Sequence, residues 1–314
     1  MATATETTRI KGVLTPVVTP FDSELRPDAK RLIRQCRWLL DQDVGLAVFG
    51  TNSEANSISL SEKFELLDAM IGAGLPPARM MPGTGCSALT ESVELTRHAV
   101  KLGCGGVLML PPFYYKGVSD EGLYRNFSEI IQRVGDSRLR IYLYHIPPVS
   151  QVPISLPLIE RLLKAYPGTI AGTKDSSGVW ENTKAMLEQF QPQGFDVFAG
   201  SETFLLATLR MGGAGCISAT ANVNPAAISR LARTWKQPDA DKQQAALDVV
   251  RSTFAKFPMI PALKAAISEF SGDPEWAVVR PPLVELDATQ RKALVEAMRA
   301  IDFSMEGLEE PALQ

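Results

Sequence analysis

Lys174 and Tyr144 could act together as a nucleophile and a proton carrier. Each is the last residue of a short apolar segment of the sequence. Lys174 ends the segment Thr169–Lys174, and Tyr144 ends Leu139–Tyr144. A lysine at the end of a buried strand is partly desolvated, which favours the neutral amine and makes it a nucleophile. A neighbouring phenol can carry protons to and from a substrate oxygen. The pair indicates carbonyl chemistry, with a solvated lysine and a core tyrosine as the structural alternatives.

Two further polar clusters follow other apolar segments. Residues 50–54 read Gly-Thr-Asn-Ser-Glu, and their N–H groups and side chains could bind a carboxylate. Tyr114 and Tyr115 follow two prolines after the segment that ends at Leu110. An ordinary capped turn and an aromatic subunit contact are the alternatives for these clusters. If the segments are parallel strands, all four sites lie at one edge of a sheet.

The elements that position these residues alternate between short apolar segments and longer amphipathic ones. Such strand–helix repeats predict a parallel sheet and the α/β class. Eight repeats in about 235 residues favour a closed (β/α)8 TIM barrel over a doubly wound sheet. The predicted strands are 14–19, 44–49, 80–85, 107–110, 139–144, 169–174, 196–199 and 215–218. The predicted helices are 28–40, 61–71, 90–102, 121–134, 156–165, 181–190, 202–211 and 225–234.

The pattern changes near residue 242, where helical segments follow one another without strands. Pro281 and Pro282 mark a loop between two of them. We therefore predict a frayed tail over residues 1–9, a catalytic barrel over 10–236 and a helical extension over 237–314 that packs on the barrel. The three helices predicted in the extension are 242–257, 260–270 and 289–301.

Composition excludes several classes of function. The 314 residues include 45% hydrophobic and 21% charged residues, with a net charge of −3. No basic stripe indicates nucleic acid, and no apolar stretch approaches the roughly 18 residues of a membrane span. The two histidines and four cysteines match no zinc motif, so we predict no metal site. A cytoplasmic protein with free thiols is the simplest interpretation.

Six segments, in their order and spacing, resemble the dihydrodipicolinate synthase / N-acetylneuraminate lyase family of class I aldolases. The resemblance covers the whole predicted barrel and implies a TIM barrel that needs no metal or organic cofactor. It also implies a homotetramer, built as a dimer of tight dimers. The matching segments are 12–21, 50–54, 114–115 with 121–124, 144–147, 172–178 and 215–222.

The resemblance also implies roles for individual residues. Lys174 is similar to the lysine that forms a Schiff base with pyruvate, and Tyr144 to the tyrosine that relays protons. Thr51 and Tyr115 match the other members of that relay, with Tyr115 reaching into a neighbouring subunit's site. The residues that match those around pyruvate are Thr51 and Asn52 at its carboxylate, and Gly200 and Ile217 along its pocket.

The sequence departs from the synthase pattern near the second substrate. Val149 stands where the synthases carry an arginine that binds a carboxylate, and an apolar side chain cannot make that bidentate contact. Such a loss typically costs roughly 1.5–3 kcal/mol, which argues against aspartate semialdehyde as the partner. Asn52 and Ser176 resemble instead the aldolases of hydroxylated 2-oxo acids. His145 replaces an asparagine, either as a polar substrate contact or as a histidine satisfied by its own loop.

Three hypotheses follow. The first is a Schiff-base lyase or aldolase, or a related hydratase or dehydratase, whose partners are a small 2-oxo acid and an aldehyde. The second is 4-hydroxy-tetrahydrodipicolinate (dihydrodipicolinate) synthase, which condenses pyruvate with aspartate semialdehyde. Val149 is the feature against it. The third is a non-catalytic barrel that binds a 2-oxo acid, and the set of Lys174, Tyr144, Thr51 and Tyr115 argues against it.

Overall fold

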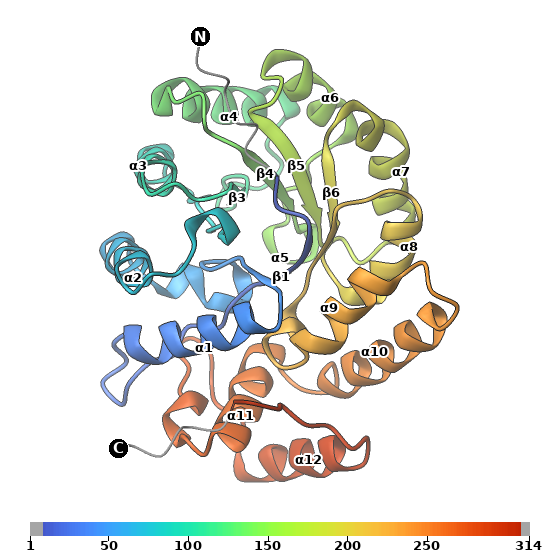
Figure 1. Ribbon diagram of the computed structural model, residues 1–314. Helices are drawn as coiled ribbons and strands as arrows, with labels where there is room; N and C mark the ends of the chain where they lie inside the picture. Colours follow the sequence, from blue (N-terminus) through green and yellow to red (C-terminus); the bar gives the residue numbers. More distant parts are fainter. Residues whose placement is uncertain (1–8, 309–314) are drawn as a thin grey trace.

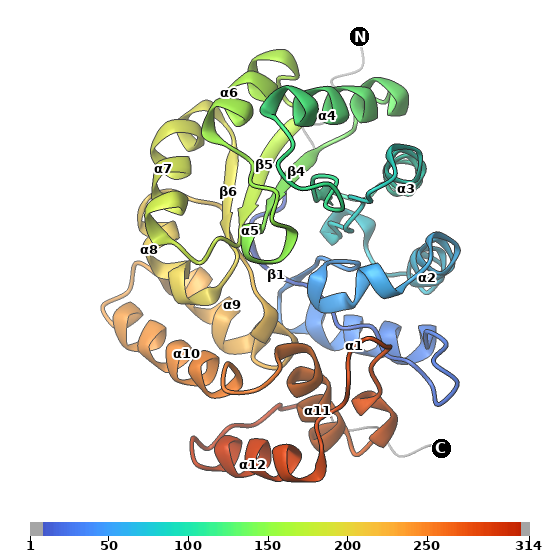
Figure 2. The same ribbon diagram turned by 180° about the vertical axis from the view of Figure 1, so that it is seen from behind.

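The computed structural model describes residues 9–308, and its centre is a curled sheet of seven parallel strands. The order in the sheet is β2-β1-β7-β6-β5-β4-β3. Figures 1 and 2 show the strands at the centre, with most of the helices around the outside. The strands are β1 (Gly12–Thr15), β2 (Gly45–Leu46), β3 (Val107–Met109), β4 (Ile141–His145), β5 (Ile170–Asp175), β6 (Asp196–Ala199) and β7 (Gly215–Ile217).

The structure confirms the α/β class and the parallel sheet, but the strand predicted over residues 80–85 is absent from the described sheet. Two isolated bridges take its place, one between Leu46 and Met80 and the other between Gly83 and Leu108. The segment contains a proline, which has no N–H to donate, and two glycines, which weaken a strand. Regular pairing is therefore interrupted between β2 and β3.

Helices separate the strands and continue beyond the last of them. Along the sheet they are α1 (Ala29–Asp41), α2 (Leu60–Gly72), α3 (Leu89–Lys101), α4 (Asp120–Val134), the short α5 (Pro147–Ser150), α6 (Leu156–Ala165), α7 (Trp180–Phe190), α8 (Leu205–Arg210) and α9 (Pro225–Thr234). The segment predicted over 202–211 starts as a 3-10 turn, Glu202–Phe204, before α8. The C-terminal helices are α10 (Ala240–Phe254), α11 (Met259–Ser271) and α12 (Ala288–Arg299).

Helix α2 begins at Leu60, one residue before the predicted start at Ser61. Its N-cap is Ser59, whose hydroxyl accepts the N–H of Glu62 at 3.2 Å. The Glu62 carboxylate in turn accepts the Ser59 N–H at 2.8 Å. This reciprocal capping box satisfies two helix-end donors at once, an advantage that Ser61 does not offer.

The two faces of the sheet pack differently because strand side chains alternate in direction. One face packs against the helices and forms the larger hydrophobic cluster, which includes Val107, Leu143 and Val197. The other face forms a smaller cluster at the inside of the curl, which includes Tyr144 and Ile217. Any reactive group on the inner face is thereby surrounded by apolar side chains.

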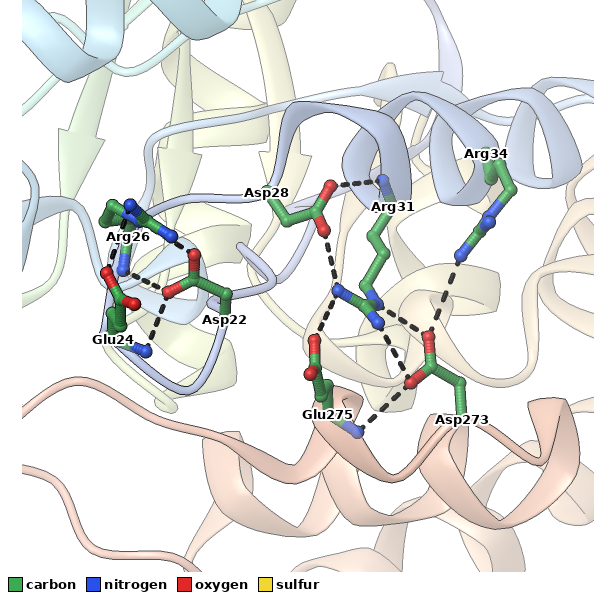
Figure 3. Close-up of polar contacts among 8 residues, drawn as sticks. All are labelled: Asp22, Glu24, Arg26, Asp28, Arg31, Arg34, Asp273 and Glu275. Carbon is green, nitrogen blue, oxygen red and sulfur yellow. Dashed lines mark hydrogen bonds and ion pairs between the residues drawn. The ribbon is translucent and has the colours of Figure 1, made fainter.

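Helices α10, α11 and α12 gather at one end of the molecule, beside α1 and α9 (Figures 1 and 2). An ion-pair cluster joins α1 to the segment after α11 (Figure 3). Arg31 Nε lies 2.6 Å from Asp273 Oδ2, and Arg31 Nη1 lies 2.6 Å from both Asp28 and Glu275 carboxylate oxygens. These carboxylates, Asp273 first, raise the pKa of Arg31 above its ordinary value.

Replacing Arg31 with methionine is expected to lower the free energy of unfolding by about 2–3 kcal/mol. The reason is that Asp273, whose side chain is 9% exposed, would keep its charge without its main partner. Urea unfolding of the variant measures this. The matched control is Arg133→Met, which breaks a pair with Glu129 whose side chains are about half exposed. An Arg31 effect no larger than that of the control would contradict the prediction.

A second ion pair predicts how stability depends on pH. Arg280 contacts both Glu62 oxygens, at 2.7 and 2.9 Å, and these hydrogen bonds lower the pKa of Glu62 to about 2. Because the folded pKa lies below the ordinary value of 4.5, the stabilisation is complete above pH 4.5 and is lost as pH falls toward 2.

The wild-type protein is expected to lose unfolding free energy when the pH is lowered from 6 to 3. In Glu62→Gln this loss is expected to be about 2 kcal/mol smaller, because the titrating carboxylate is absent. Urea titrations at the two pH values give the comparison. The control is Glu160→Gln, whose carboxylate pairs with Lys164 at the surface. Equal pH dependence in Glu62→Gln and the wild type would refute the assignment.

Candidate active site

The ends of β4 and β5 bring the two chemically interesting residues together. Tyr144 and Lys174 are paired in register on these adjacent strands. The Lys174 Nζ donates to the Tyr144 hydroxyl at 3.2 Å, and it also lies 4.3 Å from the centre of the Tyr144 ring. Both residues are only 2% exposed. A buried amine next to a phenol can act as a nucleophile with a proton carrier beside it.

Thr51 extends this pair to three groups. It begins the 3-10 turn Thr51–Ser53 that follows β2, and its hydroxyl lies 3.1 Å from the Tyr144 hydroxyl. The Tyr144 oxygen therefore lies between the Lys174 amine and the Thr51 hydroxyl. Such a row of polar groups can pass a proton away from the amine toward the turn.

The turn that carries Thr51 is tightly constrained. Phe49 before it and Glu54 after it both adopt left-handed backbone conformations, with φ of 61° and 56°. Neither residue is a glycine, so these conformations are strained and need support from the surroundings. The Gly50 N–H donates to the Ser53 hydroxyl at 3.2 Å. Asn52 lies half-buried within the same turn.

Ser176 and Gly200 lie together just beyond the ends of β5 and β6. The Gly200 N–H donates to the Asp175 carbonyl at 2.7 Å, and a Cβ at position 200 would stand 2.1 Å from the Ser176 hydroxyl oxygen. Only glycine therefore permits this close approach. Ile217 ends β7, where it is fully buried in the inner cluster with Tyr144. Gly200 thus follows β6, the strand next to that of Lys174, and Ile217 ends β7, one strand further along the sheet.

His145 is held by its own loop. Its Nδ1 accepts the Ile154 N–H at 3.0 Å, and its Nε2 lies 4.0 Å from Asp175 Oδ1. Burial lowers the pKa of His145, and the neighbouring Asp175 carboxylate opposes this effect. The Nδ1 contact requires the neutral ring to carry its proton on Nε2. A contact between His145 and substrate stays a prediction.

Tyr115 lies apart from the three groups. It is 72% exposed and packs edge-on against Tyr114, with ring centres 5.3 Å apart. Within residues 9–308, its hydroxyl makes no hydrogen bond with Thr51 or Tyr144. Its predicted place in a neighbouring subunit's site stays a prediction.

The chain is similar to known proteins over almost its whole length. Residues 9–301 match the dihydrodipicolinate synthetase family. The chain is 34% identical over 294 residues to an uncharacterized DapA-like lyase of Chloroflexus aurantiacus, covering 93% of this chain and 97% of the relative. It is 31% identical to the crystal structure of dihydrodipicolinate synthase from Agrobacterium tumefaciens, with a TM-score of 0.84 over 92% of this chain and 99% of that one.

This chain belongs to the dihydrodipicolinate synthetase family. Membership confirms the predicted family, and it also confirms that the chain is an enzyme of the lyase class. At 24% identity, the prophage protein YagE of E. coli, solved in complex with pyruvate, shares the fold. Its TM-score is 0.84 over 94% of this chain and 99% of YagE.

Lys63 is a buried residue beside the site that was not predicted from the sequence. A small cavity lined by Thr51 and Tyr144 is also lined by Lys63 of α2, which is 7% exposed. Burial lowers the pKa of Lys63, an effect that Cys86 and Glu91 oppose. The signal was present, because Lys63 shares the helical spacing of Leu66, Leu67 and Met70, the buried stripe of α2.

The described part of the chain shows neither a metal-binding group nor a membrane-spanning helix. Residues 9–308 contain no group of three His, Cys, Asp or Glu side chains placed to hold a metal ion. All four cysteines are free, and burial raises the pKa of the Cys104 thiol to about 12. Between residues 9 and 308, no helix combines the length and apolar character needed to cross a membrane.

Proposed function

We propose that this lyase forms a Schiff base between Lys174 and a 2-oxo acid, pyruvate, and makes or cleaves a carbon–carbon bond between pyruvate and an aldehyde. The observation that carries the proposal is the buried contact of 3.2 Å between the Lys174 amine and the Tyr144 hydroxyl, with Thr51 on the far side. A hydroxylated 2-oxo acid is the substrate in the cleavage direction.

The first step joins the substrate to the enzyme. The Lys174 amine attacks C2 of the 2-oxo acid, and one proton passes from the nitrogen to the ketone oxygen to give a carbinolamine. A second proton, taken from solvent, lets that oxygen leave as water and gives an iminium ion. The Tyr144 hydroxyl is placed to carry these two protons, because it lies within hydrogen-bond distance of the amine.

The second step uses the iminium as an electron sink. A base removes the proton from the C4 hydroxyl, the C3–C4 bond breaks, and its electron pair moves to the iminium to form an enamine. The aldehyde leaves, C3 of the enamine takes up a proton, and water releases pyruvate from Lys174. Tyr144 and Thr51 supply the proton path, completed in this proposal by Tyr115 of a neighbouring copy of the chain.

The residues around these groups orient the substrate. In the proposal Thr51 and Asn52 hold the pyruvate carboxylate, since the first N–H groups of a helical turn have no partner within the turn. This contact would align the carbonyl with the lysine and so lower the entropic barrier. Gly200 and Ile217 would line the pyruvate pocket. Ser176 and His145 would meet the rest of the substrate.

Val149 supports a hydroxylated 2-oxo acid over aspartate semialdehyde. It lies in α5, directly after β4, and its apolar side chain is 61% exposed. A second substrate that brings a carboxylate to this position would find no charged partner in that side chain. Synthase activity is therefore the second candidate, and a barrel that only binds a 2-oxo acid is the third.

We also propose a closed fold, an oligomeric state and a location for the whole molecule. We extend the seven-stranded sheet to a closed (β/α)8 TIM barrel, in which residues 80–85 fill the gap between β2 and β3. In this proposal the barrel spans residues 10–236 and the extension predicted over 237–314 packs on it through the part up to residue 308. Residues 309–314, and the tail predicted over 1–9 apart from Arg9, lie outside the described residues. The proposal includes no metal or organic cofactor, a homotetramer built as a dimer of dimers, and a cytoplasmic location.

Reduction with sodium borohydride in the presence of pyruvate tests the proposal. Intact-mass and peptide mass spectrometry are expected to find a reduced pyruvate adduct on Lys174. Product assays with aspartate semialdehyde and with hydroxylated 2-oxo acids then separate the synthase from the aldolase. A folded protein with no adduct from pyruvate or from larger 2-oxo acids would overturn the proposal and favour the binding-only barrel.

A further inference from the structure

The C-terminal helix α11 reaches the turn that carries Thr51 through a buried ion pair. Lys264 of α11 and Glu54, directly after that turn, are 210 positions apart, and Lys264 Nζ lies 2.5 Å from Glu54 Oε1. Both side chains are fully buried. The contact links a residue far along the chain to the site's most strained segment.

Both oxygens of the Glu54 carboxylate are bound by the C-terminal segment. Oε1 takes the Lys264 amine, and Oε2 accepts the Arg280 N–H at 2.9 Å. The Lys264 amine also donates to the Val278 carbonyl at 2.7 Å and lies 4.4 Å from the centre of the Phe21 ring. These contacts fix Glu54 from two directions.

The pair is poorly suited to a role in stability alone. Burial lowers the pKa of Lys264 to about 8, although Glu54 and Glu285 oppose this effect, and Arg280 adds to the lowering. A buried ion pair that has lost its hydration is often no more stable than apolar side chains of similar volume. What such a pair does provide is a fixed direction for each partner, because a misplaced partner leaves a charge uncompensated.

Glu54 requires that fixed direction. Its backbone is left-handed at φ 56°, and it ends the turn whose first residue, Thr51, lies 3.1 Å from the Tyr144 hydroxyl. A side chain tied on both oxygens holds this strained backbone in place. Without the tie, the turn could relax and move the Thr51 hydroxyl away from Tyr144.

We propose that Lys264 and Glu54 are positioning residues that hold Thr51 in hydrogen-bond contact with Tyr144, so that helix α11 takes part in proton transfer without touching the substrate. This inference rests on the proposed function, because it gives the Thr51–Tyr144 contact its role. A loss of about 1 Å in placement at such a contact can cost on the order of 100-fold in rate.

The test compares two steps of the same reaction. Borohydride trapping reports whether Lys174 forms the adduct, and nuclear magnetic resonance in deuterated water follows exchange of the pyruvate C3 protons. In Lys264→Met the adduct is expected to form as in the wild type, while kcat for exchange falls about 10- to 100-fold with KM little changed. The control is Asp273→Asn, which loosens the same extension at α1 and is expected to lower Tm but leave exchange within about twofold.

The double variant Lys264→Met with Glu54→Gln covers the case in which the single variant does not fold. It buries no unpaired charge, so it is expected to keep a Tm close to that of the wild type and still exchange slowly. Wild-type exchange in a folded Lys264→Met variant, or in the folded double variant, overturns the positioning role alone. Absence of an adduct in the wild type overturns the proposed function and this inference with it.

Discussion

Replacing Lys174 with methionine is expected to remove the borohydride-trapped adduct and to lower lyase activity by at least about 10⁴-fold. Methionine keeps an unbranched apolar stem in the inner cluster but has no amine to attack the carbonyl. Without the covalent iminium, the electrons of the C3–C4 bond have no sink. The measurement is product formation at saturating substrate, together with peptide mapping after reduction.

The matched control is Lys164→Met, since Lys164 is a surface lysine paired with Glu160. It is expected to leave activity and adduct unchanged. Retained activity in Lys174→Met, or an adduct that maps to another lysine, would show that the nucleophile has been misassigned. Lys174→Arg is a useful third variant, because arginine keeps a long polar side chain but its guanidinium is not a nucleophile.

Replacing Tyr144 with phenylalanine is expected to lower kcat by about 10²- to 10⁴-fold, the usual contribution of a positioned acid–base group. The change removes one oxygen atom, which contacts Lys174 at 3.2 Å and Thr51 at 3.1 Å, and leaves the ring beside the amine. Slow adduct formation on Lys174 is therefore expected to persist at high pyruvate concentration. Steady-state kinetics and trapping on the same preparation check both parts.

The control for this variant is Tyr166→Phe, which removes a surface hydroxyl that accepts from Gln132 at 3.1 Å. Because that hydroxyl is exposed and makes no contact with Lys174, Tyr144 or Thr51, kcat is expected to stay at the wild-type value. A kcat for Tyr144→Phe within about threefold of the wild type would mean that another group carries the proton.

Most elements of the fold could be predicted because their signals are local. The strand Asp196–Ala199 and the helices Leu156–Ala165 and Pro225–Thr234 have the predicted bounds. Ser155 caps the second of these elements and a proline starts the third, so the ends are marked in the sequence. The segment 80–85 gave a weaker signal, and its proline and glycines leave only isolated bridges.

The part of the site that lies at the ends of neighbouring strands could be predicted from the sequence. Lys174 and Tyr144 end apolar segments, so a parallel sheet brings them to one edge, where the structure places them side by side. Lys264 could not be found in this way, because its helix shows only an apolar pattern and its partner lies 210 positions away. Tyr115 poses a different problem, since its predicted role depends on a second copy of the chain.

The register between β4 and β5 also bears on how such an enzyme can diversify. Tyr144 and Lys174 are neighbouring positions in one hydrogen-bonded ladder, so the backbone itself sets their separation. Val149 lies outside the strands, in the short helix α5, which the ladder does not constrain. A substitution at Val149 is therefore expected to change which aldehyde the proposed site accepts while the Lys174–Tyr144 pair stays in place. The substrate range of such a fold can change in its loops while its strands stay the same.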